Sequence, residues 1–414
     1  MEKLYKKAVT ISKAAAKARR EGTTTATAPS SSSSSSSDSR LAEDPLFQYE
    51  AELLLAERDA GKPAGEGLAL LLCQSGRAAY AAKTLLAMGM RYRLSEQVLC
   101  YKTGSDAGSG KVSGGKAAPT EMARALDGAL APVLLDALRA SFGPDSLFWQ
   151  EHNYDPFLNC SRSVGYFSYV FDLNAGKAAP RNLPEQAVLA VYAQLQRLFP
   201  QQAAECGVAE WWVHSRPHSC GHQLHFDSDE TFIADGGAPT HPLVSCVVYL
   251  EEGDEACGGP TLVTDQVLGG GLATEGWLCA PARGRTLLFD AKYLHGVVPG
   301  HGVVPASAPD ARTTAVSHTS HGRRRLSFMV GFWRKLRARQ RGPGNPGPGQ
   351  DYPAEGSPRS SWRGDMGTVE MADGAVSGAC VDVPMSHVDC VWEKSSSTAP
   401  STGAPSYQAC FQGF

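Results

Sequence analysis

A series of short apolar runs in the second half of the chain constrains the fold more than any other feature. Between residues 208 and 333, runs rich in Val, Leu, Trp and Phe alternate with Gly, Pro and Asp. Short runs separated by turn-forming residues are typical of the strands of a β-sandwich or jelly roll. We expect eight strands, at Val208–Val213, His222–Asp227, Leu243–Leu250, Thr261–Thr264, Gly276–Cys279, Arg285–Phe289, Tyr293–Val298 and Arg325–Trp333.

Two longer patterns with helical spacing precede the strands. A leucine at every fourth position over 126–138 predicts a helix that begins near Thr120 and is kinked or split at Pro132. A second helix is expected between Pro184 and Pro200. Both helices are amphipathic, so each needs an apolar surface to cover. The expected fold class is therefore α+β, with helices that buttress one sheet.

Composition divides the 414 residues into four regions. Residues 1–43 include eight consecutive serines (30–37) and are expected to form a disordered leader. Residues 44–144 are Ala- and Leu-rich and are expected to be mainly helical, for example at Ala78–Met88, with a flexible loop near 104–118. Residues 145–335 hold the expected strands. Residues 336–414 are expected to form a Gly-, Pro- and Ser-rich disordered linker and tail, in which the apolar run Ala379–Trp392 returns to the domain.

Charge and cysteine usage exclude several classes of protein. The net charge of −3 argues against a general nucleic-acid surface, and the basic run 334–341 is interpreted as a solvated exit from the last strand. No stretch is apolar enough to span a membrane. The 11 cysteines form no Cys-x-x-Cys pair, which argues against a zinc ribbon and for reduced thiols. We therefore expect a cytoplasmic or nuclear protein, with organellar targeting by the basic N-terminus as the alternative.

The strongest chemical signal is the run Gly-His-Gln-Leu-His-Phe-Asp at 221–227. Side chains two apart in a strand share a face, so His225 and Asp227 are expected to project together. His295 follows another apolar run and can join them from a different strand. Two imidazoles and one carboxylate make the facial triad that binds non-haem iron(II), and the open metal positions can accept a bidentate 2-oxo acid and dioxygen.

A carboxylate-binding pair follows downstream. Arg325 and Ser327 stand two apart at the start of the last expected strand, so a guanidinium and a hydroxyl share a face. Such a pair suits the distal carboxylate of 2-oxoglutarate. Arg323, Arg324 and Arg325 are consecutive, and a slip of one residue in the strand would bring Arg324 to that face instead.

The order of five elements resembles that of the iron(II)/2-oxoglutarate-dependent dioxygenases, and most of all their prolyl-4-hydroxylase-like branch. The resemblance spans about residues 145–335 and rests on these elements: His225-x-Asp227, Gly258-Gly259-Pro-Thr-Leu, Gly284-Arg-Thr-Leu-Leu-Phe289, His295-Gly-Val-Val-Pro299 and Arg325-Leu-Ser327. It implies a double-stranded β-helix, or jelly-roll, core. It also implies hydroxylation of a C–H bond, for example in a peptidyl prolyl residue, with oxidative decarboxylation of 2-oxoglutarate to succinate and CO2.

The same resemblance assigns the site residues. His225, Asp227 and His295 would be both the Fe(II) ligands and the catalytic centre, and Arg325 would bind 2-oxoglutarate with help from Ser327. O2 would be the second co-substrate, and ascorbate a further reductant. Tyr249 is a candidate for a hydrogen bond to the co-substrate, although a tyrosine in an apolar strand also suits a packed core.

The chain departs from the family in one segment. Thirty residues separate His295 from Arg325, a longer gap than is typical, and the insert 300–322 is expected to be a mobile loop. His301 opens a second His-Gly-Val-Val-Pro and is the alternative to His295.

Further polar residues stand near the triad in the sequence. Arg216, His222 and Gln223 are candidates to line the pocket. A zinc site from His214, His218 and His222 would need a helix, which Pro217 and Gly221 disfavour.

Two other functions remain compatible with the residues. A cupin-like metal enzyme that does not use 2-oxoglutarate would keep the triad without needing Arg325. A catalytically inactive jelly roll would serve as an interaction scaffold. The substrate of the enzyme, either a protein side chain or a small metabolite, is not determined by the sequence.

Overall fold

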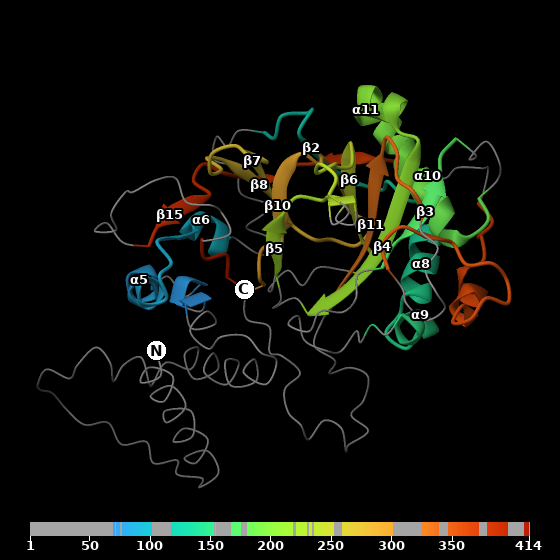
Figure 1. Ribbon diagram of the computed structural model, residues 1–414, viewed down its shortest axis with the longest axis horizontal. Coiled ribbons are helices and arrows are strands. Elements are labelled where there is room, and N and C mark those ends of the chain that lie inside the picture. The colour runs from blue at the N-terminus through green and yellow to red at the C-terminus, as the bar shows by residue number, and fades with distance from the viewer. Residues whose placement is uncertain are drawn as a thin grey trace, which may run out of the picture. The chain divides into compact units, whose positions relative to one another are not determined.

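The computed structural model describes residues 69–70, 72–74, 77–101, 117–152, 154, 167–174, 180–217, 221–229, 232–233, 236–251, 259–300, 324–338, 347–371, 379–395 and 410–413 (Figure 1). Several predictions lie outside these residues. They are the leader 1–43, most of the loop near 104–118, the insert from residue 301 with His301, and the tail 396–409. No described helix is long and apolar enough to cross a membrane.

The chain divides into two compact units. The described part of the smaller unit, drawn from 1–100 and 393–414, contains helices α5 (Ala78–Ala87) and α6 (Glu96–Leu99) and the paired strands β1 (Tyr92–Leu94) and β15 (Trp392–Lys394). Helix α5 confirms the helix expected at 78–88. Helix α6 begins at Ser95, whose hydroxyl accepts a hydrogen bond from the Val98 amide.

The larger unit contains two sheets with helices beside them. The eight-stranded sheet has the order β12-β3-β4-β11-β6-β9-β2-β13, and the five-stranded sheet has the order β14-β8-β7-β10-β5. All neighbouring strands are antiparallel except β12 and β3.

The strands of the eight-stranded sheet are β2 (Ala123–Asp127), β3 (Tyr169–Asp172), β4 (Val208–Pro217), β6 (Val244–Tyr249), β9 (Thr286–Asp290), β11 (Arg324–Trp333), β12 (Gln350–Asp351) and β13 (Val381–Val383). Those of the five-stranded sheet are β5 (His222–His225), β7 (Thr261–Val267), β8 (Gly276–Cys279), β10 (Tyr293–Val297) and β14 (Ser386–Val388). The helices of this unit are α8 (Pro132–Ser141), α9 (Leu147–Glu151), α10 (Leu183–Leu198), α11 (Pro200–Glu205) and the 3-10 helix η3 (Ser361–Met366).

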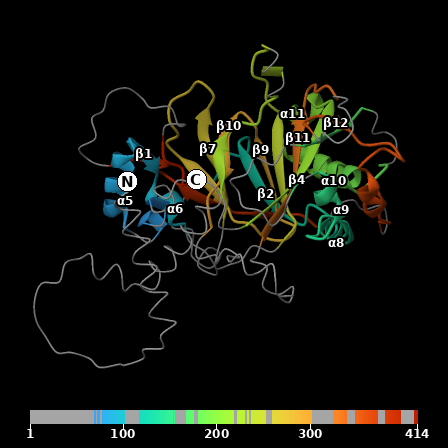
Figure 2. The ribbon, with the colours of Figure 1, turned by 60° about the horizontal axis from the view of Figure 1, so that its bottom comes forward.

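The α+β class and the buttressing helices are confirmed. A buried cluster joins Leu134 of α8 and Val191 of α10 to Phe328 and Val330 of β11, so the helices pack on one face of the eight-stranded sheet (Figure 2). Helix α10 matches the helix expected after Pro184 and is capped by Asn182. A second cluster between the sheets joins residues of β2, β6 and β9 to residues of β7 and β8.

The helix expected from Thr120 is wrong in its first half. Ala123–Asp127 forms strand β2, which pairs with β9, and Gly128 turns the chain at a positive φ of 77°. Pro132 does not kink a helix but begins α8, where its missing N–H costs nothing. The even spacing of the leucines is compatible with one face of a strand as well as with a helix, and pairing with β9 decides for the strand.

All eight expected strands are present, with ends that differ by several residues. Strand β4 runs on to Pro217, and β5 stops at His225, so Asp227 lies beyond the strand rather than in it. The C-terminal region is partly folded rather than a disordered extension. Strand β12 pairs with β3, and β13 and β14 extend the two sheets, as the apolar run 379–392 predicts.

Candidate metal centre and adjoining cavity

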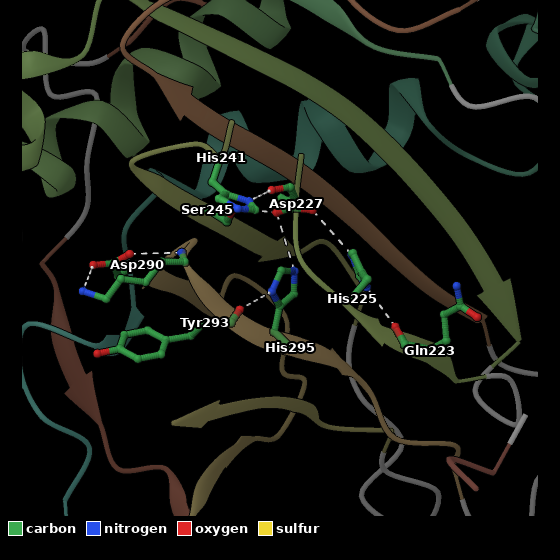
Figure 3. A network of polar contacts seen from close by, with 9 residues as sticks. Gln223, His225, Asp227, His241, Ser245, Asp290, Tyr293 and His295 are labelled. Carbon is green, nitrogen blue, oxygen red and sulfur yellow. Dashed lines mark hydrogen bonds and ion pairs between the residues drawn. The ribbon is translucent and has the colours of Figure 1, made fainter. Parts of the chain in front are cut away.

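Strand pairing brings the three predicted metal ligands together. Strand β10 pairs with β5, and the register places His295 directly opposite His225. Asp227 follows two residues after β5, and its carboxylate contacts both rings from one side (Figure 3). His225 Nε2 is 3.4 Å from Asp227 Oδ1, and His295 Nε2 is 3.5 Å from Asp227 Oδ2. The three possible ligand atoms lie within 4.8 Å of one another, a separation that suits a shared metal ion.

Backbone carbonyls fix the orientation of both imidazoles. His225 Nδ1 donates to the carbonyl of Gln223 at 2.8 Å, and His295 Nδ1 donates to that of Tyr293 at 3.0 Å (Figure 3). A carbonyl can only accept, so each Nδ1 carries a proton and each Nε2, the atom left to bind a metal, is turned toward Asp227. This is the tautomer and orientation found in histidines that bind metal through Nε2.

Asp227 is held by hydrogen bonds to its side chain and its backbone. The Ser245 hydroxyl donates to Oδ2 at 2.5 Å, and His241 Nδ1 donates to the Asp227 carbonyl at 2.6 Å (Figure 3). Burial raises the pKa of Asp227, but His295 and His225 outweigh burial and leave this pKa well below its usual value. Burial lowers the pKa of His225, but the Asp227 carboxylate outweighs it and leaves that pKa raised. The carboxylate is therefore kept ionised, the form that binds a cation.

The donor set fits the predicted metal. Two neutral imidazole nitrogens and one ionised carboxylate on one side of a site form the arrangement used by non-haem Fe(II), which leaves further positions for other ligands. The ring of Phe289 lies 4.5 Å from that of His295, so apolar packing supports one side of the site.

Strand alternation identifies which arginine faces the cavity beside the triad. Arg325, Ser327 and Met329 line that cavity, whereas Leu326 and Phe328 pack in the cluster beneath the helices. Arg325 is 6% exposed, and its Nη1 donates to the carbonyl of Gly259 at 3.0 Å. The alternatives cannot be placed in the same way, because Arg323 and the side chain of Arg324 are not among the residues that the structure describes. Arg325 and Ser327 thus share a face, as their spacing predicts.

Tyr249 both packs in the core and borders the cavity. It belongs to the apolar cluster between the sheets, and its hydroxyl forms a 2.6 Å hydrogen bond with the Thr261 hydroxyl. Burial raises the pKa of Tyr249 above its usual value, so the hydroxyl remains protonated. Tyr249 is therefore a packed core residue that also presents a protonated hydroxyl at the border of the cavity.

Other predicted pocket residues divide into those that line the cavity and those that do not. Arg216 and His222 line it, and the ring of His222 stacks at 4.6 Å on that of His225. Gln223 is exposed and points away from the triad, so its predicted pocket role is wrong. His214 and His222 lie on separate strands rather than on one helix, and His218 is outside the described residues.

Sequence reasoning missed three residues near the site. Ser245 and His241, which form hydrogen bonds to Asp227, belong to no motif that would mark them in the sequence. Tyr101 precedes a Gly- and Ser-rich stretch, yet its hydroxyl donates to the carbonyl of Pro299 at 3.1 Å and accepts from the Gly259 amide at 2.8 Å. It thereby joins Pro299 to Gly259, whose carbonyl accepts the hydrogen bond from Arg325.

Comparison with known proteins gives structural similarities only. No family model matches the sequence, and no curated protein matches it. Solved structures similar to the chain include a prolyl-4-hydroxylase of Pseudomonas putida, at 20% identity and a TM-score of 0.31 over 52% of this chain and 95% of that chain. The viral collagen prolyl hydroxylase of Paramecium bursaria Chlorella virus-1 is similar at 13% identity and a TM-score of 0.27, over 50% of this chain and 88% of that chain.

A third similar structure is HygX of Streptomyces hygroscopicus with nickel and 2-oxoglutarate bound, at 16% identity and a TM-score of 0.28 over 51% of this chain and 83% of that chain. At these identities and TM-scores the similarities do not establish an activity, so the function has to be inferred from the residues of the site.

Proposed function

We propose that this protein is an Fe(II)- and 2-oxoglutarate-dependent dioxygenase in which His225, Asp227 and His295 bind the metal. The observation that carries the proposal is the convergence of two Nδ1-anchored imidazoles on one ionised carboxylate, all within 4.8 Å. A buried, cavity-lining arginine lies beside them. Neither feature is needed to stabilise a fold, because a buried carboxylate and a buried guanidinium are both costly to desolvate.

The core strands are proposed to form a jelly roll, on the support of their nested pairing. Strand β4 pairs with β11, β5 with β10, β6 with β9, and β7 with β8. The members of each pair lie in one sheet, and successive pairs alternate between the eight-stranded and the five-stranded sheet. A long antiparallel hairpin wound into two facing sheets produces this nesting.

Arg325 and Ser327 are proposed to hold the distal carboxylate of 2-oxoglutarate. The guanidinium is fixed by its hydrogen bond to Gly259 and retains further donors for a ligand. Burial lowers the pKa of Arg325 to about 10, so the side chain remains a cation at neutral pH. A charge-assisted hydrogen bond in a buried site is stronger and more directional than one in water. Tyr249 can contribute its protonated hydroxyl to the same ligand.

Bound Fe(II), with 2-oxoglutarate and dioxygen, supplies the oxidising power to hydroxylate an unactivated C–H bond while the co-substrate is converted to succinate and CO2. The protein orients the ligands through the carbonyls of Gln223 and Tyr293 and the hydroxyl of Ser245. A peptidyl prolyl residue and a small metabolite are both candidate substrates, and ascorbate is a candidate reductant. The proposal of a prolyl substrate draws support from the motifs alone.

An anaerobic titration of the metal-stripped protein with Fe(II) and 2-oxoglutarate tests the proposal. The wild type should develop the visible charge-transfer band of a chelated 2-oxo acid. Asp227→Ala should abolish the band, and Arg325→Gln should weaken 2-oxoglutarate binding by about tenfold to a hundredfold, the effect of one lost charge-assisted hydrogen bond. Asp382→Ala and Arg124→Gln, which break an exposed ion pair, are matched controls and should leave the band unchanged.

The titration also separates the competing functions. Fe(II) binding without a band would favour a cupin-like metal enzyme that does not use 2-oxoglutarate. A band of the same strength and affinity in Arg325→Gln would contradict the proposed role of Arg325. A wild type that binds no Fe(II) would contradict the enzymatic function and favour a jelly-roll scaffold.

A further inference from the structure

The cavity contains a second arginine that the proposed chemistry does not use. Arg216 of β4 stands directly opposite Arg325 in the β4–β11 ladder, and both residues line the cavity. His214 lies two residues earlier on β4 and faces the same way, since side chains alternate along a strand. Two guanidiniums directly opposite each other on adjacent strands repel each other, and a bound anion would offset this repulsion.

The described residues provide one anion for these two cations. Of the described residues that line the cavity, Asp227 alone is a carboxylate, and it faces the imidazoles of His225 and His295. Among the described residues no carboxylate comes within ion-pairing distance of Arg216 or Arg325, whereas arginines elsewhere, such as Arg285, have such a partner. The cavity therefore has an excess of positive charge at the β4–β11 side.

On the premise that the proposed function is correct, charge balance indicates which charge the substrate should carry. Fe(II) brings two positive charges, 2-oxoglutarate brings two negative charges, and Asp227 offsets Arg325. These four groups are together neutral, and the positive charge of Arg216 remains. Arg216 is half-buried, so an ion pair there is screened less than in bulk water. One further negative charge in the cavity would offset it.

We propose that Arg216 selects a substrate that carries a single carboxylate. The carboxylate would pair with the Arg216 guanidinium, a planar group that matches its geometry. His214 offers a second contact, because its Nδ1 is buried and has no hydrogen-bond partner among the described atoms. The proposed substrate is a small organic acid or a free amino-acid carboxylate, rather than the neutral interior of a peptide chain.

The arrangement also places such a substrate close to the metal centre. The ring of His214 lies 5.8 Å from that of His222, and His222 stacks at 4.6 Å on His225. A carboxylate at Arg216 and His214 is thus separated from the metal ligands by a single imidazole. A small acid anchored there can present a C–H bond toward the triad, and a longer chain is not needed to bridge the distance.

Matched acid and amide pairs test the proposal. The probes are acetate and acetamide, phenylacetate and phenylacetamide, and N-acetylproline and N-acetylprolinamide, titrated calorimetrically into the protein loaded with Ni(II) and 2-oxoglutarate. At least one acid should bind the wild type about tenfold or more tightly than its amide, the effect of a charge-assisted hydrogen bond. Arg216→Gln should remove that preference. Arg124→Gln changes a half-buried arginine that pairs with Asp382 away from the cavity, and it should preserve the preference.

Failure of this proposal can be told from failure of the proposed function. The charge-transfer band of the Fe(II)/2-oxoglutarate complex should be the same in Arg216→Gln as in the wild type. Loss of the band in Arg216→Gln would instead make Arg216 a co-substrate ligand and overturn its role in selection. A wild type with the band but without preference for any acid would also overturn it. A wild type without the band would contradict the function itself.

Discussion

Ser245 should be a positioning residue for the metal centre, and Ser245→Ala tests this directly. Its hydroxyl donates to Asp227 Oδ2 at 2.5 Å, and the residue is 3% exposed in the middle of the eight-stranded sheet. Alanine removes the donor without adding volume, so the strand can keep its place. The carboxylate then loses one of the contacts that set its rotation relative to the two Nε2 atoms.

The expected magnitude follows from the type of hydrogen bond. A buried hydrogen bond to a charged group is worth about 1.5–3 kcal/mol, which corresponds to a change of roughly tenfold to a hundredfold in an equilibrium constant. Removing the partners of metal-binding side chains typically weakens metal affinity by about the same factor. Ser245→Ala should therefore bind Fe(II) about tenfold to a hundredfold more weakly than the wild type.

Competition with a chromogenic chelator under anaerobic conditions measures the affinity. Ser245→Thr, which keeps the hydroxyl, should restore most of it. Ser141→Ala is the matched control, because that hydroxyl donates to the carbonyl of Asp365 outside the cavity. Equal Fe(II) affinity in the wild type and Ser245→Ala would refute the positioning role. An equal loss in Ser141→Ala would show that the effect reflects general destabilisation.

Two further predictions concern stability. Burial raises the pKa of Glu210 from 4.5 to about 7, so the folded state holds this proton more tightly than the unfolded chain. The free energy of unfolding should fall by about 3 kcal/mol as the pH rises from 4.5 to 7, and Glu210→Gln should reduce the fall in melting temperature over that range; an unchanged pH profile would contradict this. In Gly296→Ala the new Cβ would lie 2.7 Å from the His222 carbonyl and would force β5 away from β10. This change should cost about 1–3 kcal/mol and weaken Fe(II) binding, whereas Gly271→Ala, which meets no atom within 4 Å, should change neither quantity.

The proposed metal ligands could be singled out from the sequence because their signals are local. His225-x-Asp227 and the run containing His295 are short segments whose chemistry is visible without knowledge of the fold. Strand alternation, however, does not by itself explain why Asp227 lies beside His225. Asp227 lies beyond the end of β5, and it is directed toward the imidazoles by Ser245 and His241 rather than by strand alternation. Such hydrogen bonds join distant segments and have no periodic signature.

Elements that depend on distant pairing were the ones that escaped prediction. Ala123–Asp127 is short and Ala-rich, and its neighbouring leucines are spaced as in a helix. It is a strand because β9 and β13 pair with it from much later in the chain. The sequence likewise left Arg324 and Arg325 as alternatives, because a slip of one residue exchanges them. The register of β11 decides for Arg325, since Leu326 and Phe328 pack in the cluster beneath the helices and Arg325 lines the cavity.

The most direct test of the metal centre is a structure of the anaerobic complex with Fe(II) and 2-oxoglutarate, with the metal located by its anomalous scattering. We expect one iron bound to Nε2 of His225, Nε2 of His295 and a carboxylate oxygen of Asp227, with the distal carboxylate of 2-oxoglutarate at Arg325. Iron bound elsewhere, or bound through Nδ1 of either histidine, would contradict the proposed centre. A distal carboxylate at Arg216 instead of Arg325 would keep the centre and contradict the assigned co-substrate site.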